Sequence, residues 1–139
     1  MHMSQLIYYS EKRDLGRGGV DAILETARRE NQSRSLTGLL MFNRNFFLQC
    51  LEGGRETVTT TFCKIAADPR HGNVTLISVH QIDARDFPDW TMGYVVSTSE
   101  QMKSALREFL PTEDFNPRLL TSGSAVNLMK RMRSMELTV

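Results

Sequence analysis

The sequence predicts an α+β fold: a ferredoxin-like βαββαβ sheet with an added fifth strand, two helices on one face and two C-terminal helices on the other. Short apolar and β-branched runs, typical of strands, alternate with stretches in which apolar residues recur at helical spacing. Their order is strand, helix, strand, strand, helix, strand, strand, as in a ferredoxin-like sheet with one more strand. Two further helical stretches can cover the open face. We expect a core over residues 1–96 and a two-helix extension over residues 97–139.

The first strand and helix are predicted from a change of period. Residues 6–10 cluster aromatic and aliphatic side chains before a polar, glycine-rich stretch, which indicates a short strand with Tyr8 and Ser10 on one face. From Gly18 onward the spacing becomes helical, and this helix should end near Asn31, a residue type that tolerates helix ends. The apolar residues that carry the helical pattern are Val20, Ile23, Leu24 and Ala27.

A hairpin and a second helix follow. Residues 36–42 and 46–51 are two β-type runs joined by a short Asn-rich turn, and Gln49 is a polar side chain within the second, otherwise apolar, strand. The next helix should lie between Gly54 and Asp68. Its apolar face consists of Val58, Phe62, Ile65 and Ala66.

Two more strands and two helices complete the predicted order. Residues 74–79 are β-branched and apolar, and residues 90–96 form the fifth strand, in which Trp90 and Met92 alternate onto one face. The two C-terminal helices are indicated by apolar stripes. These stripes are Met102, Ala105, Leu106 and Phe109 in the first, and Ala125, Leu128, Met129 and Met132 in the second.

Composition excludes several classes of protein. The 139 residues include 17 Lys and Arg against 16 Asp and Glu, a net charge of +1, whereas proteins that bind nucleic-acid phosphates normally carry a basic excess. No apolar run approaches the roughly 20 residues of a membrane-spanning helix, and the N-terminus lacks a signal-peptide pattern. Cys50 and Cys63 have the spacing of neither a metal site nor a disulfide framework. We therefore expect a cytoplasmic protein without a nucleic-acid, membrane or metal partner.

One group of polar and aromatic residues admits two interpretations. A glutamine inside an apolar strand is more often a structural hydrogen-bonding group than a functional one. Together with a phenol, an indole, a thioether and polar helix ends, it could instead line the edge of a planar, polar-edged ring. The residues concerned are Tyr8, Asn31, Gln49, Asp68, Trp90 and Met92. The residues alone leave open a small ferredoxin-like enzyme, similar to an acylphosphatase or a monooxygenase, and an interaction module without a cofactor.

Five sequence blocks, in order and spacing, resemble the BLUF domain family, the sensors of blue light that use FAD. The resemblance covers roughly residues 3–96. The blocks are Leu6-Ile7-Tyr8-Tyr9-Ser10, Asn31 ahead of Leu36-Thr37-Gly38-Leu39-Leu40, Phe47-Leu48-Gln49-Cys50-Leu51-Glu52-Gly53, Asp68-Pro69-Arg70-His71 and Trp90-Thr91-Met92. The resemblance implies a non-covalent FAD between the two core helices. It assigns cofactor binding to Asn31, Lys64, Asp68, Arg70 and His71, with Tyr8 and Gln49 also at the flavin.

The resemblance also implies how such a chain works. Excited flavin would take an electron and a proton from Tyr8, and the Gln49 amide would then change its hydrogen bonds. Trp90, Met92 and Ser10 would relay the signal, with either Trp90 or Met92 near Gln49. The chain would then be a photoreceptor and not an enzyme. It would act through an effector protein or as a homo-oligomer, a dimer or larger ring.

Two positions depart from the family pattern. Cys50 follows Gln49 where an aliphatic residue is usual, which would affect packing. Lys64 stands where an arginine is common, so a bidentate phosphate contact would be replaced by a point charge.

Overall fold

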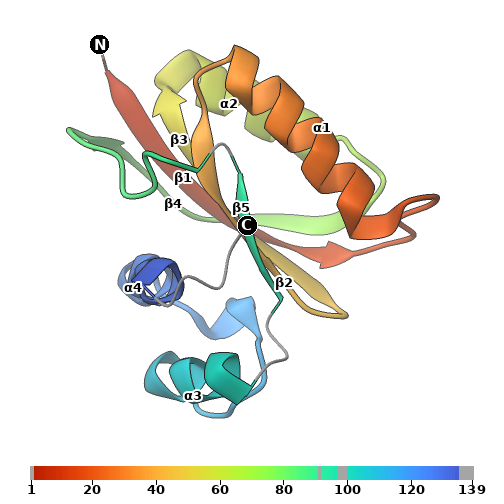
Figure 1. The fold of residues 1–139 in the computed structure, drawn as a ribbon, viewed down its shortest axis with the longest axis vertical. Coiled ribbons are helices and arrows are strands. Elements are labelled where there is room, and N and C mark those ends of the chain that lie inside the picture. The colour runs from red at the N-terminus through yellow and green to blue at the C-terminus, as the bar shows by residue number, and fades with distance from the viewer. Residues whose placement is uncertain (1, 91, 97–99, 135–139) are drawn as a thin grey trace.

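The structure, a computed structural model, describes residues 2–90, 92–96 and 100–134. A five-stranded sheet with the order β4-β1-β3-β2-β5 separates two pairs of helices (Figure 1). The strands are β1 (Met3–Lys12), β2 (Thr37–Phe42), β3 (Phe46–Gly54), β4 (His71–Ile82) and β5 (Gly93–Val96). The helices are α1 (Gly19–Ser33), α2 (Arg55–Ala66), α3 (Glu100–Phe109) and α4 (Ser122–Ser134), with a short 3-10 helix, η1 (Pro117–Leu119). The ferredoxin-like fold with an added strand is confirmed.

The first four strands pair antiparallel, and β5 is added parallel to β2. Strands β1 and β4 are longer than predicted because they hydrogen-bond to each other over most of their length, including polar positions with weak strand propensity. Helix α1 continues to Ser33, so Asn31 lies inside the last turn of the helix and not at its end.

Two apolar layers lie on opposite faces of the sheet. The α1–α2 core contains Leu6, Tyr8, Leu40, Phe47, Leu51 and Met92 together with residues of the two helices. The α3–α4 core contains Ile7, Leu39, Met41, Leu48 and Cys50 together with the stripes of α3 and α4. Alternate residues of β1 and β3 thus enter different cores, as the period of a strand requires. The predicted cover of the second face by the C-terminal helices is confirmed (Figure 1).

The prediction for the fifth strand was wrong at its start. Strand β5 begins at Gly93, so Trp90 and Met92 lie in the loop between β4 and β5 and not on one face of a strand. Met92 is buried in the α1–α2 core, whereas Trp90 packs against the α3–α4 core. The Trp90 ring stacks on Phe87, with the ring centroids 5.7 Å apart. The alternation of faces applies only to extended backbone, and this loop turns repeatedly before the strand starts.

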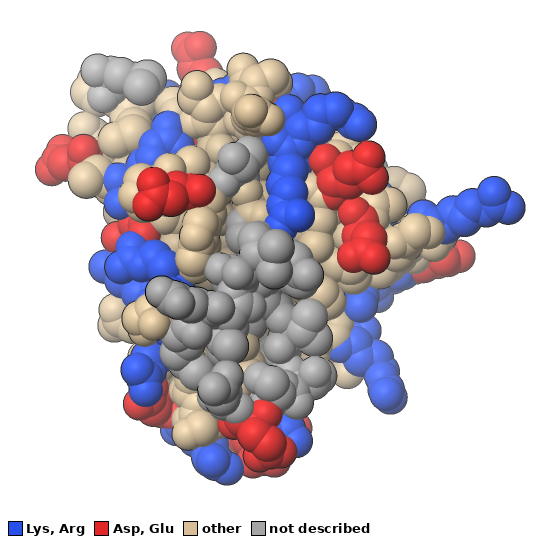
Figure 2. All heavy atoms as spheres, in the orientation of Figure 1, with Lys and Arg blue, Asp and Glu red and all other residues tan. Residues whose placement is uncertain are grey.

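Charges of both signs are mixed over the face seen in Figure 2, without one sign gathering in a patch. Among the described residues, no helix combines the length and apolarity that a membrane span needs. The same part of the chain holds no group of three or more His, Cys, Asp or Glu side chains placed to bind a metal ion.

Candidate functional site

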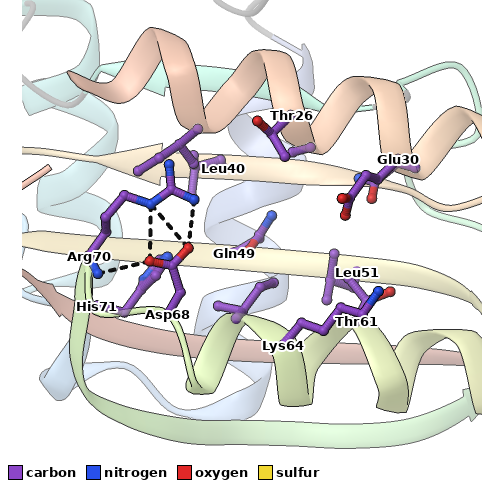
Figure 3. A pocket seen from close by; sticks show the side chains of 14 residues that line it. Thr26, Glu30, Leu40, Gln49, Leu51, Thr61, Lys64, Asp68, Arg70 and His71 are labelled. Carbon is purple, nitrogen blue, oxygen red and sulfur yellow. Dashed lines mark hydrogen bonds and ion pairs between the residues drawn. The ribbon is translucent and has the colours of Figure 1, made fainter. Parts of the chain in front are cut away.

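A cavity of about 270 Å³ lies between α1 and α2, above β2 and β3 (Figure 3). Its volume is close to the lower end of ligand pockets, roughly 300 to 1,000 Å³. The apolar lining residues are Ile23, Ala27, Leu40, Leu51 and Ile65. The polar lining residues are Thr26, Glu30, Asn31, Gln49, Thr61, Lys64, Asp68, Arg70 and His71. The structure thus brings together six of the residues singled out in the sequence: Asn31, Gln49, Lys64, Asp68, Arg70 and His71.

A phenol and a carboxamide form a hydrogen-bonded pair beside this cavity: Gln49 lines it, whereas Tyr8 is not one of its lining residues. Antiparallel pairing of β1 and β3 places Tyr8 directly opposite Gln49, and the Tyr8 hydroxyl donates to Gln49 Oε1. The Tyr8 ring is fully buried and packs edge-on against Phe62, with the ring centroids 5.5 Å apart. Burial, with a smaller contribution from the negative charge of Asp68, raises the pKa of Tyr8 well above its usual value. Tyr8 therefore stays neutral and keeps the proton that it donates.

The other end of the Gln49 amide faces Met92. Gln49 Nε2 donates to Met92 Sδ at 3.5 Å, and the backbone carbonyl of Met92 accepts from Arg28 Nε at 3.0 Å. Met92 is therefore in contact with β3 through its thioether and with α1 through its backbone. Trp90, on the opposite side of the sheet, does not belong to this group.

Ser10 is connected to the cavity through His71. The buried Ser10 hydroxyl and His71 Nδ1 are 2.7 Å apart, and the His71 ring lies 4.8 Å from Phe47, centroid to centroid. Cross-strand pairing of β1 with β4 brings these residues together, although they are 61 positions apart in the chain. The structure thus groups Ser10 with His71, on a different side of Tyr8 from Met92.

Asp68 and Arg70 form an ion pair at one end of the cavity (Figure 3). Arg70 Nη2 lies 2.6 Å from Asp68 Oδ2, and the Arg70 backbone N–H donates to Oδ1 at 2.9 Å. The hydrogen bonds from Arg70 lower the pKa of the Asp68 carboxyl, and those to Asp68 raise the pKa of Arg70. Much of the guanidinium charge is thus engaged within the protein, while Lys64 is exposed on the neighbouring turn of α2.

Three further polar residues, Thr26, Glu30 and Thr61, line the cavity and were not predicted. Figure 3 shows Glu30 entering from α1 and Thr61 from α2. Arg34 links them, with its Nη1 3.7 Å from Glu30 Oε2 and 3.4 Å from Thr61 Oγ1. Glu30 follows Ile23, an apolar residue of the predicted helix, by seven positions. Residues at this spacing share one face of a helix, so the sequence could have predicted that Glu30 faces the cavity.

Replacing His71 by Asn is expected to reduce the loss of stability on acidification. Burial lowers the pKa of His71 below 6.5, Asp68 opposes this shift and Arg70 adds to it. Since the unfolded chain binds a proton at His71 more readily than the folded chain, the stabilisation that neutral His71 provides is complete above about pH 6.5. It is lost as the pH falls below that value. Urea unfolding at about pH 7 and about pH 5 measures the effect. His80→Asn, at an exposed position of β4, is the control, and equal losses in His71→Asn and wild type would contradict the assignment.

Comparison with known proteins gives consistent matches. The family model described as sensors of blue light using FAD matches residues 3–93. The photoactivated adenylate cyclase subunit beta of Euglena gracilis is 34% identical over 126 residues, which cover 89% of this chain but only 14% of that protein. The photo-activated state of BlsA is similar in structure, with a TM-score of 0.84, 29% identity and 93% of each chain covered. The dark state of BlrB, a BLUF protein, matches with a TM-score of 0.76, 29% identity and 98% of each chain covered.

Proposed function

Because the chain belongs to the BLUF family, the sensors of blue light using FAD, we propose that it is a blue-light photoreceptor that binds FAD non-covalently in the cavity between α1 and α2. The observation that carries this proposal is the hydrogen-bonded pair of Tyr8 and Gln49 at the cavity. A buried, neutral phenol is both an electron donor and a proton donor. A carboxamide presents a donor and an acceptor on opposite ends and can change which of them faces a ligand.

The lining of the cavity fits a flavin ring. Its walls include aliphatic side chains from both helices and from β2 and β3, which suit the faces of a planar aromatic ring. Asn31 and Gln49 supply amide groups that can hydrogen-bond to a polar ring edge. The volume suits the ring and not the whole dinucleotide, so the phosphates would be bound at the rim by Lys64, with Arg70 and His71 close by.

Bound flavin would supply absorption of blue light and an acceptor for one electron. Tyr8 would provide that electron, and its hydroxyl proton can move to Gln49 Oε1, to which it already donates. When the electron returns from the flavin and the proton returns to Tyr8, the phenol oxygen can pair with either end of the amide, since a hydroxyl both donates and accepts. Gln49 can therefore be held in two orientations without any movement of the backbone.

The contact between Met92 and Gln49 would change with the orientation of the Gln49 amide. Its sulfur is a weak acceptor and now receives Gln49 Nε2 at 3.5 Å. After rotation of the amide, the Gln49 oxygen would face the sulfur, and two acceptors repel each other. An unbranched thioether can repack at low cost, so the signal would leave the site through Met92. Because Trp90 lies two residues away on the other side of the sheet, it would respond through the loop and not through contact with flavin.

We propose that residues 1–96 bind flavin and that residues 97–139 carry the signal to a second copy or to an effector protein in the cytoplasm. The Euglena gracilis relative is named as an adenylate cyclase, and for this chain we propose sensing without turnover. Light scattering in the dark and under blue light would detect the proposed dimer or larger ring, and a monomer in both states would contradict it.

Absorption spectroscopy on the purified protein tests the main proposal. We expect a yellow protein whose flavin band shifts to the red in blue light and recovers in the dark, and which releases intact FAD on denaturation. A colourless protein would contradict flavin binding and would favour the module without a cofactor. A yellow protein without a reversible shift would contradict the photoreceptor assignment and would reopen the small-enzyme alternative.

A further inference from the structure

We propose that Glu52 is a positioning residue: it anchors one end of the β4–β5 loop so that Met92, at the other end, is held against Gln49. This loop lies between Ile82 and Gly93 and is described at residues 83–90 and 92. The inference rests on the proposed function for its signalling role. The anchoring itself does not depend on flavin and can be tested without light.

Glu52 is a fully buried carboxylate that is not part of the cavity. Its Oε2 accepts from the backbone N–H of Asp86 at 2.8 Å and from Gln5 Nε2 at 2.8 Å. Its Oε1 accepts from the backbone N–H of Phe87 at 2.9 Å and from Thr37 Oγ1 at 3.4 Å. Consecutive backbone amides of the loop are thus bound to the two oxygens of one side chain. Charge-assisted hydrogen bonds of this kind are strong in a buried setting.

The anchored part of the loop also contacts α4. Lys130 Nζ lies 3.3 Å from Asp86 Oδ1, and Arg133 donates to the Asp86 backbone carbonyl. The Arg133 guanidinium also lies over the Phe87 ring, 5.8 Å from its centroid. The segment that Glu52 holds is therefore the segment at which the loop meets the last helix.

Between the anchor and Met92 the loop crosses from one face of the sheet to the other. The Trp90 backbone N–H donates to the Phe87 carbonyl at 3.4 Å, and the Gly38 N–H donates to the Trp90 carbonyl at 2.9 Å. Met92 then reaches Gln49 on β3, the same strand that carries the anchor three residues further on. If Met92 is released while Phe87 stays bound, the intervening backbone must adjust. The anchor thus converts a local change at Gln49 into a movement of Trp90.

The geometry requires a carboxylate at position 52 and not merely a polar side chain. In Glu52→Gln, one oxygen becomes an NH₂ group. In either amide orientation this NH₂ faces the N–H of Asp86 or of Phe87, so one buried backbone donor loses its acceptor. The shape of the side chain is almost unchanged, so the substitution breaks one of the two backbone hydrogen bonds of the anchor with little effect on packing.

Fluorescence of Trp90, the only tryptophan of the chain, tests the anchor directly. In the dark, we expect acrylamide to quench Trp90 severalfold more strongly in Glu52→Gln than in wild type. In blue light, wild type should show a change in quenching, whereas Glu52→Gln should keep its flavin red shift and show no further change. Glu25→Gln makes the same chemical change at an exposed position of α1 and should behave as wild type.

Results that contradict the anchor differ from results that contradict the proposed function. Dark quenching in Glu52→Gln equal to that of wild type would overturn the anchor, and loss of its flavin red shift would mean that Glu52 acts on the Tyr8–Gln49 pair itself. A wild-type protein without a red shift would contradict the proposed function but would leave the dark comparison valid.

Hydrogen exchange on the wild-type protein provides a second test if the variant does not fold. The amides of Asp86 and Phe87 should exchange at least about tenfold more slowly than those of Ala84 and Asp89. This is the factor expected for buried hydrogen bonds of about 1 to 2 kcal/mol. Equal exchange rates at these four amides would overturn the proposal.

Discussion

The Tyr8→Phe variant is expected to bind flavin and to lose the light-induced red shift completely. Phenylalanine keeps the buried ring and its edge contact with Phe62, so the nearby cavity is preserved. The substitution removes the hydroxyl that donates to Gln49 Oε1, and with it the proposed source of the electron and the proton. Absorption spectra before and after blue light measure the shift. Flavin fluorescence should also rise, because an electron donor close to an excited flavin quenches it.

Stability provides an independent readout of the same substitution. Without the hydroxyl, the buried Gln49 oxygen loses its partner, which should lower the free energy of unfolding by about 1 to 3 kcal/mol. Tyr9→Phe is the matched control, since Tyr9 is the next residue on β1 and points toward the α3–α4 core. A normal red shift in Tyr8→Phe would refute Tyr8 as the donor, and loss of the shift in Tyr9→Phe would show that the effect is not specific.

The Gln49→Leu variant should also lose the red shift, for a different reason. Leucine fills a similar volume but has neither a donor nor an acceptor, so no hydrogen bond can be rearranged. Electron transfer from Tyr8 does not require the amide, and flavin fluorescence should therefore stay low in this variant. The difference in fluorescence between Gln49→Leu and Tyr8→Phe separates the switch from the electron donor.

The loss of the amide should also be visible in unfolding experiments. Gln49→Leu leaves the fully buried Tyr8 hydroxyl without its acceptor, which should cost about 1 to 3 kcal/mol. Gln32→Leu, at an exposed position of α1, makes the same chemical change away from the cavity and should leave both absorption and stability nearly unchanged. A reversible red shift in Gln49→Leu would refute the amide as the switch.

Both variants concern residues whose faces could be predicted from the sequence. Tyr8 and Gln49 lie in regular strands, where side chains alternate strictly between two faces. The same rule correctly separated Gln49 from Leu48 and Cys50, which enter the opposite core. Helical spacing likewise placed the apolar face of α1 on the sheet. In α2 it did so for Val58, Phe62 and Ile65 but was wrong for Ala66, which is exposed. In a regular strand or helix the direction of the side chains repeats with a fixed period, and the spacing of apolar residues in the sequence shows that period.

The cavity was only partly predictable. The resemblance to BLUF proteins named Asn31, Lys64 and Asp68, and the structure places all three on the cavity wall. Thr26, Glu30 and Thr61 lie within the helices, on the stripe that faces the cavity, and were not predicted. The hydrogen bond between Ser10 and His71 could not be predicted from the sequence, since it depends on how β1 pairs with β4.

The sequence by itself determined the order of the elements, the class of the sheet and the face of each strand residue. Only the tertiary structure decided that Met92 contacts Gln49 while Trp90 lies on the other side of the sheet. The reason is physical: a loop has no period, and its path is set by bonds to distant residues. Here Glu52 binds the loop amides 34 and 35 positions away, and no local pattern in the chain encodes that contact.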